Sequence, residues 1–150
     1  MILTIMAMSK MFTQLLAFTG GTGELVQLVA NLSLDPTAML IVMLAVPFLM
    51  CMFIDTIAVI LLTIPIYQPV VTGLGFDPVW FWVLFLINIT LGAITPPFGY
   101  TLFAFKAVVP EMSLGDVYRA TWPFVLLFLA GITVIIIAPS IATWLPDAVG

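Results

Sequence analysis

The chain of 150 residues is 64% hydrophobic and only 7% charged, and it contains no histidine. A soluble domain of this size cannot bury so much apolar surface, so the composition excludes a soluble globular protein and predicts a membrane protein. The formal net charge of -4 comes from three basic and seven acidic residues that lie mostly in the connecting segments, so it indicates no particular partner, and we expect no nucleic acid among the partners.

The first expected element is a membrane helix over residues 1–19, with Gly20-Gly21 as its stop signal. Lys10 lies in this segment, so it either faces protein or water or extends to the membrane surface from a helix end. The segment lacks a basic start and a small-residue cleavage site, and we do not expect a signal peptide. Residues 23–34 predict a short amphipathic helix that lies along the membrane interface.

Asp35-Pro36 predicts a helix start, because an N-cap carboxylate is followed by proline at the first helical position. The apolar stretch behind it would measure roughly 45 Å as one helix, against a hydrocarbon thickness of about 30 Å, but two full crossings need roughly 40 residues. We therefore expect a re-entrant helical hairpin over residues 37–72, with its tip at residues 53–56. Such a tip needs surrounding protein or a water-filled cavity. The alternative is one tilted helix with Asp55 near a membrane surface.

Asp77-Pro78 repeats the start signal and predicts a second helix over residues 78–105. Its second half reads NITLGAITPPFGYTLF. Because Pro96-Pro97 lacks backbone N–H groups, the carbonyls of Gly92 and Ala93 are expected to lose their helical partners, and the helix is expected to break there. The alternative is a proline kink that neighbouring helices repair.

A break at this depth predicts a cation site, since freed carbonyls in lipid need a donor or a positive charge. The first half-helix ends with its negative pole at the break, and the second begins with its positive pole, which suits an anionic substrate group near Pro97 and Phe98. Sodium prefers several hard oxygen ligands. The expected ligands come from the residues before and within the break: Asn88, Thr90, Gly92, Ala93 and Thr95.

The rest of the chain predicts an interfacial turn over residues 113–120 and a last membrane helix over residues 121–145, which Pro139 bends or ends. Arg119 before this helix favours a cytoplasmic start for it. The only cysteine, Cys51, is expected to be a small buried apolar residue.

We do not expect an enzyme, because the chain has no histidine and no metal-ligand cluster, and Asp55 is the only carboxylate deep in an apolar run. A channel is disfavoured by the small number of polar residues.

Residues 52–103 closely resemble the C-terminal half of the large membrane subunit of tripartite ATP-independent periplasmic (TRAP) transporters. The family has three local patterns, G-M-F-x-D, G-x-D-P and N-x-x-x-G-x-x-T-P-P-x-G. The matching positions here are Met52, Phe53 and Asp55, then Gly75, Asp77 and Pro78, then Asn88, Gly92, Thr95, Pro96, Pro97 and Gly99. Cys51 departs from the glycine that is usual in the first pattern.

The resemblance implies an all-α integral membrane protein with transmembrane helices, a re-entrant helical hairpin and a discontinuous helix. It would be the second inverted repeat of an elevator-type ion-coupled transporter in the bacterial inner membrane. The implied function is sodium-coupled uptake of small organic acids (carboxylates), with sodium as coupling ion and no other cofactor. The implied substrate-binding residues come from the hairpin tip and the break: Asp55, Thr56, Thr95, Pro97, Phe98 and Gly99.

The implied partners are a small four-helix membrane subunit, a periplasmic substrate-binding protein, the N-terminal half of the large subunit and membrane lipid. Family members are far longer, and the first repeat is absent from this sequence. We therefore expect either a fragment or a chain that a separate polypeptide completes, because a site at the membrane midplane needs both repeats. The alternative is a non-transporting membrane fragment or scaffold.

Overall fold

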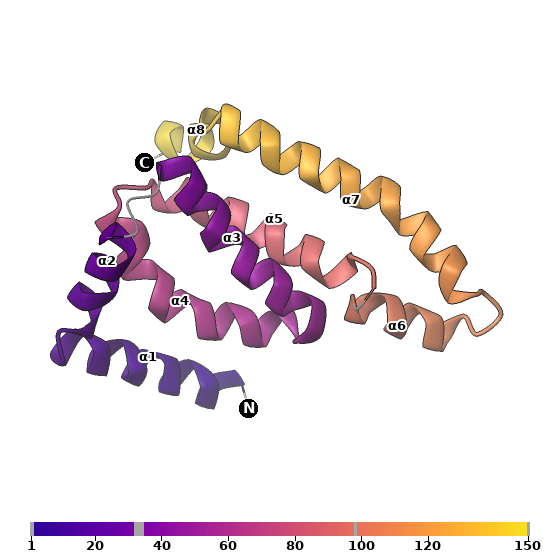
Figure 1. Cartoon of the computed structure of the whole chain (residues 1–150), viewed down its shortest axis with the longest axis horizontal. Coiled ribbons are helices and arrows are strands. Elements are labelled where there is room, and N and C mark those ends of the chain that lie inside the picture. The colour runs from indigo at the N-terminus through magenta and orange to yellow at the C-terminus, as the bar shows by residue number, and fades with distance from the viewer. Residues whose placement is uncertain (1, 32–34, 98, 150) are drawn as a thin grey trace.

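The computed structural model describes residues 2–31, 35–97 and 99–149, and these residues form helices joined by short connections. In chain order the helices are α1 (Ile2–Phe18), α2 (Gly21–Asn31), α3 (Pro36–Phe53), α4 (Thr56–Gly73), α5 (Pro78–Ile94), α6 (Tyr100–Val108), α7 (Leu114–Ile137) and α8 (Ser140–Val149). Figure 1 shows α3 beside α5, with α7 along one edge of the molecule and α1 along the opposite edge.

The membrane protein predicted from composition and the all-α fold implied by the resemblance agree with these elements. Within the described residues, α3, α4 and α7 are long and apolar enough to cross a membrane, and α5 is a shorter apolar helix. Each 18-residue helix, α3 and α4, is about 27 Å long, close to the hydrocarbon thickness of a bilayer. Large apolar side chains are exposed on these helices, as expected for surfaces that face lipid or further protein.

Two predicted helix starts are confirmed. Asp35 Oδ2 accepts a hydrogen bond from the Thr37 backbone N–H at 3.1 Å, and Asp77 Oδ1 accepts one from the Trp80 N–H at 2.9 Å. Gly75 precedes the second start with a φ of 73°, a left-handed conformation that glycine adopts without strain. The sequence thus places the beginnings of α3 and α5 correctly.

The segment over residues 37–72 forms two helices, α3 and α4, separated by Ile54 and Asp55 alone. The separation falls inside the predicted tip at residues 53–56. Pro47 lies within α3 without ending it, and Pro65 and Pro69 lie within α4. The two helices therefore form a hairpin with a very short turn.

The C-terminal part differs from the sequence prediction. The turn expected at residues 113–120 is the beginning of α7, which continues without interruption to Ile137. Ser113 caps this helix, because its Oγ accepts the Asp116 backbone N–H at 3.1 Å, and the helix continues through both Gly115 and Pro123. Helix α7 ends just before Pro139, and α8 begins directly after it.

Helices α3 and α5 form the tightest described contact in the core. A Cβ atom added to Gly92 of α5 would lie 2.7 Å from the Phe48 carbonyl oxygen and 2.9 Å from Cys51 Cβ in α3. Cys51 is fully buried, as its sequence context predicts. One helical turn before Gly92, the Asn88 Nδ2 group donates a hydrogen bond of 2.7 Å to the Leu44 carbonyl. At Gly92 the backbones of α5 and α3 are therefore so close that no side chain fits between them.

Replacing Gly92 by alanine should force α5 away from α3, because the added methyl group meets a backbone carbonyl that cannot rotate aside. We expect a loss of about 1–3 kcal/mol in unfolding free energy, as for other overpacked core positions. Thermal unfolding in detergent, followed by tryptophan fluorescence, measures it.

The matched control for this change is Gly131→Ala. Gly131 is another helical glycine, in α7, and a Cβ there meets nothing within 4 Å. This variant should be neutral or more stable, since alanine favours helix. Equal destabilisation by both variants would contradict the close α3–α5 contact.

Candidate functional site

The helix predicted over residues 78–105 is interrupted between Ile94 and Tyr100. Thr95 is extended, with φ -81° and ψ 125°, and α6 begins after Gly99. The sequence predicted a break between Gly92 and Pro97, and the interruption begins at Thr95, inside that range. The reason is that the Pro96 ring displaces chiefly the residue before it, Thr95, while the turn at Gly92 can still form.

The carbonyls of Gly92 and Ala93 lose their usual helical donors, as predicted, because residues 96 and 97 are prolines, but other donors replace them. The Gly92 carbonyl accepts the Thr95 backbone N–H at 3.3 Å, and the Ala93 carbonyl accepts the Thr101 hydroxyl at 2.6 Å. Thr95 Oγ1 also donates to the Leu91 carbonyl at 2.6 Å. The Thr95 N–H and the Thr101 hydroxyl therefore replace the two amide donors that the prolines remove. The Thr95 hydroxyl serves the Leu91 carbonyl, to which the Thr95 N–H would otherwise bond.

The remainder of the break is held by one backbone contact and one distant side chain. The Gly99 N–H donates to the Thr95 carbonyl at 3.0 Å, and a Cβ at Gly99 would lie 2.7 Å from the Ala93 carbonyl oxygen. From α7, the Tyr118 hydroxyl donates to the Pro97 carbonyl at 2.8 Å. The peptide bond between Pro96 and Pro97 is cis. The break is thus a compact turn with defined bonds.

The hairpin tip is organised by Asp55. Its Oδ2 accepts the backbone N–H groups of Ile57 at 3.0 Å and Ala58 at 3.4 Å, so Asp55 is the N-cap of α4. The next residue, Thr56, has its hydroxyl 3.3 Å from the Tyr100 hydroxyl at the start of α6. The hairpin tip and the break therefore meet where α4 and α6 begin.

These two helix starts differ in charge. The Asp55 carboxylate compensates the positive pole of α4, because it is bound to the first free N–H groups of that helix. Helix α6 starts at Gly99 with no side-chain cap hydrogen bond within the described residues. Of the two positive poles that meet here, the one at α6 is the better suited to an anion.

The predicted site residues fall into two groups. Gly92, Ala93, Thr95, Pro97 and Gly99 come together at the break, and Asp55 and Thr56 join them through the Tyr100 contact. Phe98 lies outside the described residues. Asn88 and Thr90 do not reach the break.

The two outlying residues have other partners. Asn88 is 6% exposed and donates to Leu44 of α3. Thr90 is exposed and donates to the Leu86 carbonyl of its own helix at 2.8 Å. Asn88 stands seven residues before Thr95, or roughly 10 Å along α5. Of the residues expected to ligate sodium, these two have the least support from the geometry.

Sequence reasoning missed Tyr100, Thr101 and Tyr118. The first two directly follow the double-proline motif, at the first two positions of α6, so their hydroxyls were a signal for contacts to the break. Tyr118 is 21 residues from its partner Pro97, and no local sequence pattern predicts that contact.

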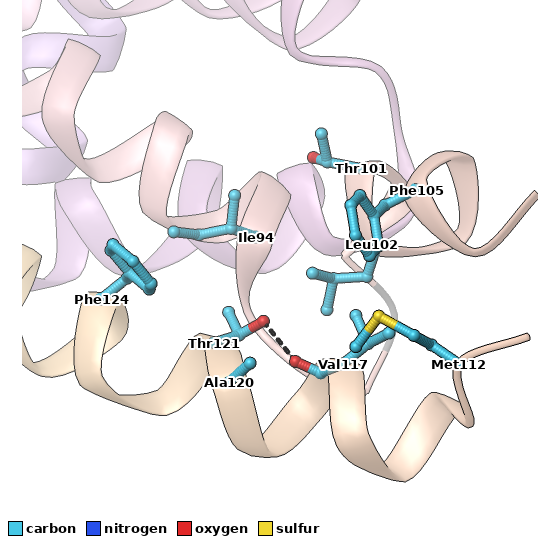
Figure 2. Close-up of a pocket in the computed structure, with 9 residues that line it drawn as sticks. All are labelled: Ile94, Thr101, Leu102, Phe105, Met112, Val117, Ala120, Thr121 and Phe124. Atoms are coloured by element: carbon cyan, nitrogen blue, oxygen red, sulfur yellow. Dashed lines mark hydrogen bonds between the residues drawn. The ribbon is translucent and has the colours of Figure 1, made fainter. Parts of the chain in front are cut away.

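Beside the break, α6 and α7 line an open apolar pocket of about 300 Å³ (Figure 2). Its lining residues are Ile94, Thr101, Leu102, Phe105, Met112, Val117, Ala120, Thr121 and Phe124. Both lining threonines donate their hydroxyls to backbone carbonyls, Thr101 to Ala93 and Thr121 to Val117 at 2.8 Å, the latter drawn in Figure 2. The pocket therefore suits apolar groups and is distinct from the polar junction of tip and break.

A metal centre of the usual acidic or sulfur type is not expected at the junction. Within the described residues, no group of three or more Cys, Asp or Glu side chains could hold a metal ion. A cation there would have to use backbone carbonyl and hydroxyl oxygens, which suit hard cations that need no thiolate or imidazole.

Replacing Thr101 by valine should loosen the break, because the Ala93 carbonyl loses its donor in an apolar setting. We expect amide hydrogen exchange at residues 95–102 to rise about five- to tenfold, as befits one lost hydrogen bond. The control is Thr133→Val, which removes a similar hydroxyl bond, from Thr133 to Leu129 within α7, away from the break. Unchanged exchange at the break in the Thr101 variant would contradict the bond's role.

Comparison with known proteins agrees with the resemblance seen in the sequence. The family model described as the DctM component of the tripartite ATP-independent periplasmic transporter matches residues 1–141. The chain is 31% identical over 143 residues to the ectoine TRAP transporter large permease protein TeaC of Halomonas elongata, covering 95% of this chain and 33% of that protein. It is 30% identical over 150 residues to the C4-dicarboxylate TRAP transporter large permease protein DctM of Pseudomonas aeruginosa, covering 100% of this chain and 35% of that protein.

The substrates after which these relatives are named differ. The ectoine/5-hydroxyectoine protein UehC of Ruegeria pomeroyi is 32% identical over 136 residues, covering 91% of this chain and 32% of that protein. This chain spans about a third of the length of these relatives, and no solved structure matches it. The family match over residues 1–141, together with the helical fold, shows that the chain is a membrane protein of the TRAP transporter large permease family.

Proposed function

We propose that this chain forms the C-terminal part of a sodium-coupled secondary transporter that takes up small organic acids. The observation that carries the proposal is the junction of the hairpin tip with the break, joined by the Thr56–Tyr100 contact. Interrupted helices within a membrane protein are where ion and substrate sites form, because irregular backbone at membrane depth must line a cavity or be buried in protein.

The proposed sodium site lies at the C-terminal end of α5. This end carries the negative pole of the helix, and the Gly92 and Ala93 carbonyls and the Thr95 hydroxyl gather there. Each of these carbonyl oxygens accepts one described hydrogen bond and has two lone pairs, so one remains for an ion. The ion would then add to a turn that is already bonded instead of supplying its only partners.

The proposed substrate group is a carboxylate at the start of α6. Gly99 leaves this helix without a side-chain cap. The Thr56 and Tyr100 hydroxyls bond each other there, so one of the two keeps a proton to donate to a carboxylate. Pro97 and Phe98 complete the proposed lining. Asp55 would repel a carboxylate, so we assign it to the capping of α4 and to the shape of the tip.

The membrane arrangement follows the same proposal. The α3–α4 hairpin would enter the bilayer and return to the same side, and it would move with the broken helix in an elevator-type transition as the second inverted repeat. The N-terminal part of the large subunit, a small membrane subunit and a periplasmic substrate-binding protein would complete the system in the bacterial inner membrane. The family membership supports these partners in general terms.

A non-transporting membrane piece is the second candidate. It is favoured by the coverage of only about a third of each relative, since a site shared between two repeats needs both. Uptake by the chain together with the rest of the large subunit separates the two candidates.

The double change Pro96→Ala and Pro97→Ala tests the sodium site in the completed transporter, reconstituted with its binding protein and a carboxylate substrate. Restoring two N–H groups should favour helix through the break, since proline disfavours a helix interior by about 3 kcal/mol relative to alanine. We expect sodium-dependent uptake to fall by more than about tenfold. Uptake driven by an imposed sodium gradient measures it.

The control for this experiment is Pro139→Ala, which lies at the α7–α8 boundary, away from the break. It should retain uptake. Unchanged sodium dependence in the double variant would count against the proposed site, and absent uptake in the unmodified system would favour the non-transporting alternative.

Cysteine scanning of residues 50–60 in a Cys51→Ala background tests the hairpin. A tip that reaches a water-filled cavity predicts labelling of cysteine at Asp55 by a polar, membrane-impermeant maleimide, with protection at the buried positions 51 and 59 on either side. Labelling that changes steadily toward one end of the scan would indicate a single crossing helix.

A further inference from the structure

Asn88 is buried between α5 and α3, and its side-chain amide acts there as a hydrogen-bond donor, whereas a cation ligand would use the amide oxygen. Its Nδ2 group donates a 2.7 Å hydrogen bond to the Leu44 carbonyl of α3, and only 6% of the residue is exposed. Leu44 stands three residues before the buried Pro47. This proline has no N–H for the carbonyl of Met43, the neighbour of Leu44, and its ring crowds that carbonyl. The amide thus supplies a donor to the α3 backbone where the helical ladder is weakened.

A second contact between α5 and α3 lies one helical turn after Asn88. Gly92 follows Asn88 by four residues, on the same face of α5, and meets Phe48 and Cys51 of α3 at backbone distance. Leu44 and Phe48 are likewise four residues apart. The two helices are therefore in register at two successive turns, one contact polar and the other steric, which fixes both the sliding and the rotation of α5 on α3.

This register determines where the two interruptions end up. Ile54, the first residue after α3, lies ten residues beyond Leu44, or roughly 15 Å along the helix axis. Thr95, the first residue after α5, lies seven residues beyond Asn88, or roughly 10 Å. The remaining offset is spanned by the Thr56 and Tyr100 side chains, whose hydroxyls lie 3.3 Å apart. A slip by one helical turn would move the partners about 5 Å apart and break that contact.

We propose that Asn88 is a positioning residue that sets the register between hairpin and broken helix through its amide N–H, and that it is not a ligand of the transported cation. The proposal differs from the sequence-based expectation, which counted Asn88 among the oxygen ligands. Two measurements test this proposal, and only the second of them, sodium-dependent uptake, rests on the proposed function.

The experiment compares Asn88→Asp with Asn88→Leu in the completed transporter. Aspartate keeps an oxygen that could bind sodium but loses the N–H donor, whereas leucine loses both. The first readout needs no transport: cysteines replace Thr56 and Tyr100 in a Cys51→Ala background, and a short bifunctional thiol reagent joins them. The second readout is the sodium dependence of uptake.

The control is Gln68→Met, which removes another side-chain amide between helices. Gln68 Oε1 accepts the Trp82 Nε1–H at 3.1 Å, between α4 and α5, at an exposed position. This variant should leave the cross-link yield unchanged.

For a positioning residue, both Asn88 variants should lower the cross-link yield by roughly fivefold or more, as expected when a buried acceptor loses its donor. Both should also lower the maximal uptake rate by roughly tenfold, while the sodium concentration for half-maximal uptake stays within about twofold. Normal cross-linking in both variants would overturn the proposal. So would an aspartate variant that transports with a strongly shifted half-maximal sodium concentration while the leucine variant is dead.

The two readouts separate this inference from the proposed function. If the unmodified transporter shows no sodium-dependent uptake, the proposed function fails, while the cross-link comparison still decides the role of Asn88.

Discussion

The rest of the structure depends on how the backbone is satisfied where α5 is interrupted. Two successive prolines remove donors in a setting with little water, and each unsatisfied carbonyl there would be costly. The chain supplies the missing donors itself: Thr101 reaches back across the break, Thr95 turns to its own helix, and Tyr118 arrives from α7. The carbonyls at the break therefore have donors within the chain, and an ion would bind to a turn whose geometry is already defined.

This organisation changes the physical basis of the proposed transport site. In the proposed sodium site each carbonyl already has one donor: the Gly92 oxygen accepts from the Thr95 N–H and the Ala93 oxygen from the Thr101 hydroxyl, which leaves one lone pair on each in a defined direction. Selectivity for an ion would then depend on the spacing of these oxygens. The same holds for the neighbouring helix starts, where Asp55 occupies the positive pole of α4 and leaves that of α6 for an anionic group.

The close packing of α3 on α5 connects these local features. Gly92 allows the approach, Asn88 bonds the α3 backbone, and Cys51 fills the space opposite Gly92 without exposed surface. Two interruptions that are about 40 residues apart in the sequence meet because the helices that lead to them are held in register. The apolar pocket between α6 and α7 lies beside this core and contributes no polar group to it beyond hydroxyls already bonded to backbone.

The sequence alone determined the features that depend on neighbouring residues. Composition indicated the membrane, aspartate-proline pairs indicated the starts of α3 and α5, and the double proline indicated the end of α5 to within two residues, because capping and proline geometry act over one helical turn. Only the tertiary structure decided which oxygens are already bonded. The partners of Asn88 and Pro97, Leu44 and Tyr118, lie on other helices, 44 and 21 residues away, and such partners depend on packing that local patterns do not encode.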